Sequence, residues 1–159
     1  MSVAEMMSQD VKTCRPQDTL NSAAHLMWEF DCGCVPVVDS DNHVVGMLTD
    51  RDICMAAYTQ GALLSELGVA SAMSKEVYTC GPQDTPAAAE ELMRAHQIRR
   101  LPVVDAAGRL VGLVSLNDLA REAGRQPARK TKRQVKADEV ITTLAAICAR
   151  RPGPQLSAA

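Results

Sequence analysis

The sequence contains an internal repeat that covers most of its length. Residues 7–53 align with residues 73–119 at a constant offset of 66 and without a gap, so that TCRPQDT at 13–19 returns as TCGPQDT at 79–85. Agreement of this kind indicates a tandem duplication. Each copy has roughly 55 residues, too few to bury much apolar surface alone, so we expect each to lay its apolar face on the other. The expected product is a pair with an approximate internal twofold axis and a cleft, a frequent ligand site, between its halves.

Each copy carries the same order of expected elements, β-α-β-β-α. The expected strands are 11–14, 35–38 and 44–48 in the first copy and 77–80, 101–104 and 110–114 in the second. The expected first helices cover 20–30, with Leu20, Ala23, Met27 and Phe30 on one face, and 86 to about 96, where Thr85 suits the N-cap and Pro86 the first helical position. The predicted fold class is therefore α+β: two tandem β-α-β-β-α units packed as a pseudo-twofold pair, with short leading turns at 3–7 and 69–73 and a C-terminal helix.

The junction between the second strand and the second helix is the most informative motif. It reads GMLTDRD at 46–52 and GLVSLND at 112–118, which places Thr49 and Ser115 at the expected N-caps and Asp52 and Asp118 three residues later. One interpretation is a plain capping arrangement. The other is a nucleotide site, because the N–H groups at a helix N-terminus suit phosphate and a carboxylate can accept both hydroxyls of a ribose. Two copies of the motif that face one cleft favour the nucleotide.

At these residues the chain resembles a known family. The two junctions, together with VPVVD at 35–39 and LPVVD at 101–105, are similar to those of a tandem pair of CBS (cystathionine β-synthase) domains, a Bateman module, of the stand-alone signal-transduction type. The resemblance covers about residues 3–123 and implies a first domain over 3–60 and a second over 69–123. It also implies a cleft for an adenosine compound such as AMP, ADP, ATP, NAD or S-adenosylmethionine as a regulatory ligand, no required cofactor, and a disc-shaped homodimer of two pairs.

The resemblance assigns ligand-binding roles to residues of both copies. It implies that Asp52 and Asp118 hold ribose hydroxyls and that Thr49 and Ser115 contact ribose or phosphate. The residues implied to wall the adenine are Thr13, Val35 and Pro36 in one half and Thr79, Leu101 and Pro102 in the other. Arg99 and Arg100 are similar to the basic residues that reach phosphates in nucleotide-sensing members; the alternative for them is a solvated strand entrance.

The two copies differ around these positions. The first has a glycine and a cysteine at 33–34 where the second has two arginines, and it has Arg51 where the second has Asn117. We count Arg51 and Asn117 among the candidate ligand contacts. We therefore expect two pockets of unequal affinity, of which the pocket of Asp118 prefers the more phosphorylated ligand.

Several classes of protein are disfavoured. The sequence has no phosphate-binding G-x-x-x-x-G-K-[ST] loop, no G-x-G-x-x-G motif and no nucleophile elbow, so we expect no enzyme. The cysteines at 32 and 34 are one residue apart, closer than the usual zinc pair, so we expect no metal site. No apolar run is long enough to span a bilayer, and the first ten residues carry two acids and no base, unlike an export signal. We therefore expect a cytoplasmic protein with no membrane partner, whose six cysteines are mostly reduced thiols, with a regulatory disulfide as the alternative.

The C-terminal part lies outside the repeat and is basic. The chain has a formal net charge of −2, yet residues 121–136 carry seven basic residues and one acidic residue. We expect a basic linker over 124–134, followed by an amphipathic helix over 135–150 with Val140, Leu144, Ile147 and Cys148 on one stripe. This helix is expected to pack on the pair or across a dimer.

The leading interpretation is a non-catalytic nucleotide sensor that signals to a protein effector, which the sequence does not identify. One alternative is a ligand-free interaction or oligomerisation module. Another is a nucleic-acid-associated regulator that uses the basic segment 121–136. The four aromatic residues are too few for a stacking surface, so nucleic acid is not the expected partner.

Overall fold

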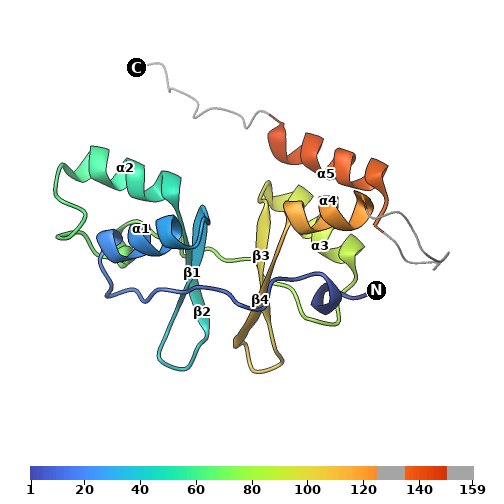
Figure 1. The fold of residues 1–159 in the computed structure, drawn as a ribbon, viewed down its shortest axis with the longest axis horizontal. Coiled ribbons are helices and arrows are strands. Elements are labelled where there is room, and N and C mark those ends of the chain that lie inside the picture. The colour runs from blue at the N-terminus through green and yellow to red at the C-terminus, as the bar shows by residue number, and fades with distance from the viewer. Residues whose placement is uncertain (125–134, 150–159) are drawn as a thin grey trace, which may run out of the picture.

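The computed structural model describes residues 1–124 and 135–149, which form two similar units and a C-terminal helix (Figure 1). The first unit contains α1 (Leu20–Glu29), β1 (Cys34–Val38), β2 (Val44–Thr49) and α2 (Asp50–Gln60). The second contains α3 (Pro86–His96), β3 (Arg100–Val104), β4 (Leu110–Ser115) and α4 (Leu116–Gly124), and α5 (Ala137–Cys148) follows. The 3-10 turns η1 (Val3–Glu5) and η2 (Val69–Ser71) precede the units at the expected places. The α+β class and the C-terminal helix are confirmed, while residues 125–134 of the expected linker lie outside the described residues.

Each unit is built on an antiparallel hairpin. Val35 pairs with Leu48 in the first hairpin and Leu101 with Val114 in the second, and both hairpins carry an irregularity at the same repeat position. The expected strands 11–14 and 77–80 are wrong as strands, because each is reduced to a single parallel bridge. The next rung of each ladder requires the N–H of residue 16 or 82, and both residues are prolines, which have none.

The hydrophobic core consists of two clusters, one in each unit, instead of one layer between the units. The first gathers Leu20, Ala23 and Met27 of α1 against the β1–β2 hairpin, and the second gathers Ala89 and Met93 of α3 against β3 and β4. The expectation that each copy buries its apolar face on the other is therefore wrong. Phe30 is also wrong as a core residue: it caps the end of α1, is 49% exposed, and packs its ring 4.5 Å from Lys12 Nζ.

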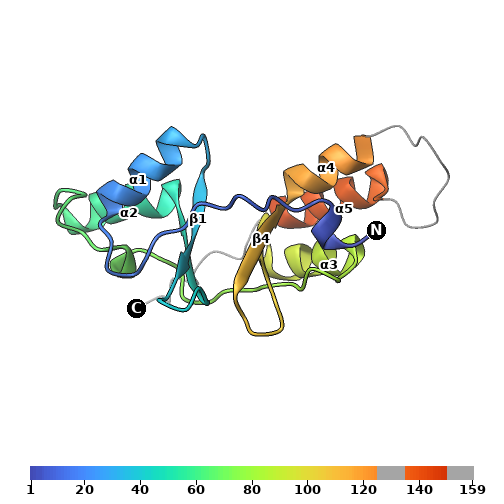
Figure 2. The same ribbon diagram turned by 60° about the horizontal axis from the view of Figure 1, so that its bottom comes forward.

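The units are joined by an exchange of their leading segments (Figure 2). Val3 of η1 is buried in the second cluster, and its N–H donates to Asp84 O over 2.8 Å. Val69 of η2 is buried in the first cluster, and its N–H donates to Asp18 O over the same 2.8 Å. Each unit therefore has its first turn supplied by the segment that precedes the other unit.

Glycines stand where the exchanged segments cross the hairpins. A Cβ on Gly46 would lie 2.7 Å from Met73 Sδ and 3.0 Å from Ser74 O, so the crossing segment would have to shift to admit a side chain. Gly112, the equivalent residue, meets Met7 in the same way. The absence of a side chain thus allows the two chain segments to pass each other.

The tips of the hairpins also meet. The Leu110 N–H donates to Asn42 O over 2.9 Å, and His43 Nε2 lies 3.1 Å from Ala107 O. Together with the exchanged segments, these contacts fix the two units relative to each other.

Helix α5 lies on α3 and α4 of the second unit (Figure 1). Val140, Thr143 and Ile147 are buried there, and Arg94 Nη1 donates to Thr143 Oγ1 over 3.1 Å. The predicted apolar stripe is correct at positions 140 and 147, whereas Leu144 is 44% exposed and Cys148 is exposed. In the described part of the chain no helix has the length and apolar character needed to cross a membrane.

Candidate functional site

A cavity of about 630 Å³ lies between the two units. Residues 31–34, just before and at the start of β1, line it from the first unit. The second unit contributes the start of β3 and the junction of β4 with α4. The complete lining is Ser8, Asp31, Cys32, Gly33, Cys34, Arg100, Leu113, Ser115, Asn117, Asp118, Ala120 and Arg121. The cavity thus contains Arg100, Ser115, Asn117 and Asp118 from the residues predicted by sequence.

The junction of β4 with α4 forms a reciprocal cap. The Ser115 N–H and Oγ donate to Asp118 Oδ2 over 2.8 and 2.6 Å, while the Asp118 N–H donates back to Ser115 Oγ over 3.3 Å. Asp118 is only 5% exposed. The capping interpretation is therefore correct for Oδ2.

The equivalent junction of β2 with α2 has the same cap. The Thr49 N–H and Oγ1 donate to Asp52 Oδ2 over 2.9 and 2.7 Å. Asp52 Oδ1, by contrast, accepts no hydrogen bond from any residue in the ranges 1–124 and 135–149. The two aspartates thus share their cap and differ in the surroundings of the second oxygen.

Arg121 causes this difference and was not predicted as a site residue. Its Nη2 donates to Asp118 Oδ1, the oxygen that the cap leaves free. The signal was in the sequence, because an aspartate and an arginine three residues apart lie on the same face of a helix. Arg121 is therefore a charged residue of the cavity that was not among the predicted ligand contacts.

Arg100 reaches across the cavity toward the first unit. Its Nη2 is 3.9 Å from the position that a Cβ on Gly33 would occupy. Burial raises the pKa of the neighbouring Cys34 thiol above its usual value, and the charge of Arg100 acts in the opposite direction. The arginine therefore places its positive charge on the first unit's side of the space.

The other predicted ligand residues lie elsewhere. Val35, Pro36, Leu101 and Pro102 are buried within β1 and β3, Thr13 and Thr79 are half-buried, and Arg51 and Arg99 are exposed. Among the described residues that line the cavity, none of these eight occurs, nor do Thr49 and Asp52. The structure thus brings together four predicted residues of the second half, and it leaves the other four of that half and all those of the first half outside this cavity.

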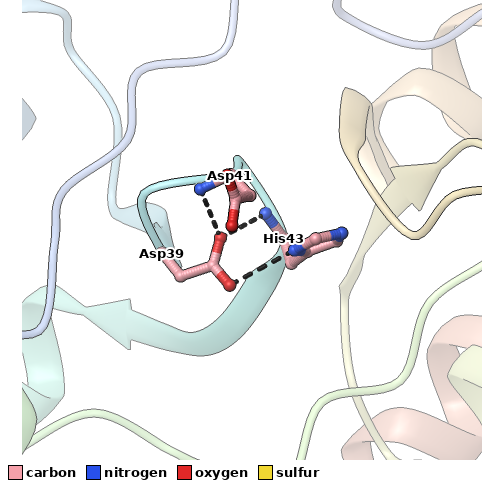
Figure 3. A group of neighbouring side chains, drawn as sticks. All are labelled: Asp39, Asp41 and His43. Carbon is pink, nitrogen blue, oxygen red and sulfur yellow. Dashed lines mark hydrogen bonds and ion pairs between the residues drawn. The ribbon is translucent and has the colours of Figure 1, made fainter.

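One group of potential metal ligands is present at the tip of the first hairpin (Figure 3). Asp39 Oδ1 accepts the N–H groups of Asp41 and His43, each over 2.9 Å, and His43 Nδ1 lies 3.2 Å from Asp39 Oδ2. Asp105 makes the same two backbone bonds in the second hairpin, where no second acid or histidine follows. The hydrogen bonds of the turn therefore account for this cluster without a metal.

A second cavity, of about 340 Å³, lies where α5 meets α3. Its lining includes Glu90, which is 2% exposed and whose Oε1 has no hydrogen-bond partner in the described residues. Burial and, to a smaller extent, the charge of Glu139 raise the pKa of Glu90, while Arg94, 3.9 Å away, opposes them. The arrangement makes ionised Glu90 unfavourable in the folded protein.

Comparison with known proteins supplies the wider setting of these features. The family model described as "CBS domain" matches residues 3–58 and again residues 69–125. The CBS domain-containing protein YhcV of Bacillus subtilis is 42% identical over 119 residues, which cover 75% of this chain and 83% of that protein. Enzymes also match, but only over a part of their own length. Homoserine O-acetyltransferase of Methanococcoides burtonii is 33% identical over 123 residues, which cover 77% of this chain and 24% of the enzyme.

Two solved structures with bound ligands resemble the fold. The CBS domain pair of protein MJ0100, in complex with 5'-methylthioadenosine and S-adenosyl-L-methionine, superposes with a TM-score of 0.67 at 25% identity and covers 76% of this chain and 94% of that one. CBSX2 in complex with AMP gives a TM-score of 0.68 at 26% identity, with coverage of 77% and 95%.

Proposed function

Because the chain belongs to the CBS domain family and carries two tandem copies of the domain, we propose that it is a non-catalytic regulatory module that binds an adenine nucleotide between its units. Binding would favour one arrangement of the pair over another, and a partner protein would respond to that arrangement. A ligand can shift such an equilibrium only by its difference in affinity for the two states.

The observation that carries the proposal is the composition of the 630 Å³ cavity. It combines a helix N-terminus, a buried aspartate at that terminus and the guanidinium groups of Arg100 and Arg121. Backbone N–H groups and guanidinium groups suit phosphate, and a carboxylate suits the two hydroxyls of a ribose. Adenosine compounds bound to the MJ0100 pair and to CBSX2 support an adenine nucleotide as the ligand class.

Unequal binding by the two halves is part of the proposal. The second half offers Arg100, whereas the equivalent residue of the first half is Cys34, a buried thiol that carries no charge. Arg51 is exposed and does not replace this charge within the cavity. The proposed order is therefore that the cavity of Asp118 binds phosphorylated ligands more tightly than the site of Asp52.

The exposed face of α1 and α2 supports a homodimer. Trp28 is 88% exposed and Tyr58 is 82% exposed, which is unusual for large aromatic side chains of a monomer. On the second unit the corresponding helices, α3 and α4, are covered by α5. We place the dimer contact on α1 and α2, and a cytoplasmic location fits the six free thiols.

Ligand-induced stabilisation tests the proposal. AMP, ADP, ATP, NAD and S-adenosylmethionine are added to the full chain, and the melting temperature is followed, because a ligand that binds only the folded state raises it. Asp118→Ala and Asp52→Ala should each weaken binding at their own site about tenfold or more, the effect of about 1.5–3 kcal/mol for one lost hydrogen bond to a charged group.

Asp105→Ala is the matched control, since this aspartate caps a hairpin turn outside the cavity. The substitution should leave the affinity for the nucleotide unchanged. No stabilisation by any of the five ligands at millimolar concentration would contradict the proposal and favour a ligand-free interaction module. Unchanged affinity in both Asp→Ala variants at the two junctions would reduce those residues to helix caps.

A further inference from the structure

We infer that Arg121 is a specificity-determining residue: it pairs with Asp118 before a ligand binds, and it moves to the ligand's phosphate when the ribose hydroxyls take its place on Asp118. This inference rests on the proposed function, because it names how that same cavity distinguishes nucleotides from nucleosides.

The hydrogen bonds of Asp118 identify the group that must leave. Both carboxylate oxygens are used: Oδ2 by the N–H and Oγ of Ser115, and Oδ1 by Arg121. The cap bonds lie within one helical turn and hold the N-terminus of α4, so breaking them costs helix stability. Arg121 is 70% exposed on its side chain, and an ion pair in contact with water is weak. Displacing Arg121 from Oδ1 therefore costs a ribose diol less free energy than breaking the cap bonds to Oδ2.

The displaced guanidinium stays near the site. Arg121 lies one helical turn after Asp118 and lines the same cavity as Arg100. With Asp118 taken by ribose, two arginine side chains would face the space without the carboxylate that one of them had paired with. A phosphate supplies a new anion and accepts paired N–H bonds from a guanidinium.

The exchange has opposite consequences for two ligand classes. A nucleotide breaks the Arg121–Asp118 pair and offers Arg121 a phosphate in return. A nucleoside breaks the same pair and offers nothing. Arg121 should therefore weaken the binding of adenosine and strengthen the binding of ADP.

The first half of the chain has no arginine at the position equivalent to Arg121. Met55 occupies the position equivalent to Arg121, is 46% exposed, and leaves Asp52 Oδ1 without a partner among the described residues. The chain therefore contains one site with the arginine and one without it. Arg121→Met makes the second site resemble the first, and Met55→Arg makes the reverse change.

The test measures the affinity of adenosine and of ADP separately by isothermal titration calorimetry. All proteins carry Asp52→Ala, which weakens the first site so that the titration reports the cavity of Asp118. Arg121→Met is expected to bind adenosine several-fold more tightly and ADP about tenfold more weakly, the loss of one charge-assisted contact. Arg121→Lys, which keeps the charge, should restore part of the ADP affinity and keep the affinity for adenosine low.

Salt and the reverse variant provide independent readouts. The ADP affinity of Arg121→Met should fall less between 50 and 300 mM NaCl than that of the parent, because one charged contact is gone. With Asp118→Ala to weaken the second site, Met55→Arg should lower adenosine affinity at the first site. A purely structural role for Arg121 would change both ligands alike and would leave the salt dependence as it was.

The outcomes separate the inference from the proposed function. If the parent protein binds neither adenosine nor ADP, the proposed function fails and this inference fails with it. If the parent binds ADP but Arg121→Met changes adenosine and ADP affinity by the same factor, or changes neither, the proposed function survives and the role of Arg121 is refuted. The melting temperature of each variant without ligand checks that the variant is folded.

Discussion

Replacing Val3 with alanine tests whether the first residues of the chain belong energetically to the second unit. Val3 is 0% exposed and packs in the cluster of α3, β3 and β4. The substitution removes two methyl-sized groups at about 0.8 kcal/mol each, about 1.6 kcal/mol in total, and the cavity left behind raises the loss to about 2–3 kcal/mol. Val69, at the same repeat position, is also 0% exposed but packs in the first cluster, so Val69→Ala is the matched control.

Native-state hydrogen exchange is the assay, because it reports stability segment by segment. A loss of 2 kcal/mol corresponds to roughly 30-fold faster exchange, at 1.4 kcal/mol for each tenfold. Val3→Ala should raise the exchange rates of the amides in α3 and β3 by about this factor and those in α1 and β1 much less. Val69→Ala should instead raise mainly the exchange rates in α1 and β1. Faster exchange confined to α1 and β1 in Val3→Ala would refute the exchange of segments. Equal acceleration in both units would refute the idea that the two clusters open separately.

Two further predictions follow from buried titratable groups. Because folding raises the pKa of Glu90 above its ordinary 4.5, the ionised group costs stability, and the cost grows as pH rises from about 4.5 through the raised value. At pH 7.5 the free energy of unfolding of Glu90→Gln, measured by urea denaturation, should therefore exceed that of the parent by about 1–3 kcal/mol. This difference should shrink toward pH 5, and a difference that stays constant with pH would contradict the prediction. Burial raises the pKa of Cys14 to about 12 and that of Cys80 to about 11, so at pH 8 iodoacetamide should modify exposed Cys54 at least about tenfold faster, as measured by mass spectrometry. Equal rates at the three cysteines would show that the clusters open readily.

The repeat allowed most of the local structure to be predicted, because duplicated turn and cap residues reinforce each other. Thr19 and Thr85 accept the N–H groups of Ser22 and Ala88, as their sequence positions indicate for N-caps. The exchange of leading segments could not be predicted, since a constant offset is the same whether residues 3–7 pack on their own copy or on the other. The contacts that distinguish the two arrangements, such as the burial of Val3 in the second cluster and the close approach at Gly46, lie between residues far apart in the sequence and require coordinates.

The candidate site was predicted in part for a similar reason. The cap of Asp118 follows from local spacing, and the structure places Arg100, Ser115 and Asn117 in the same cavity. The adenine walls were inferred from resemblance and stay a prediction: Val35 and Leu101 are core residues of their strands and do not line this cavity. Sequence spacing gives the neighbours within one helical turn, but it does not tell which strand residues face a space between two units.

Helix α5 gives a nearly symmetric molecule a distinct front and back. Without α5, the duplicated units would present two similar helical surfaces. A molecule with two self-associating surfaces can add copies indefinitely and form filaments. Because α5 occupies the surface of α3 and α4, the surface of α1 and α2, which carries Trp28 and Tyr58, has no equivalent cover among the described residues. If two copies associate through that surface, as we propose, growth would stop at the dimer, and the short helix after the repeat would act as a terminator of assembly.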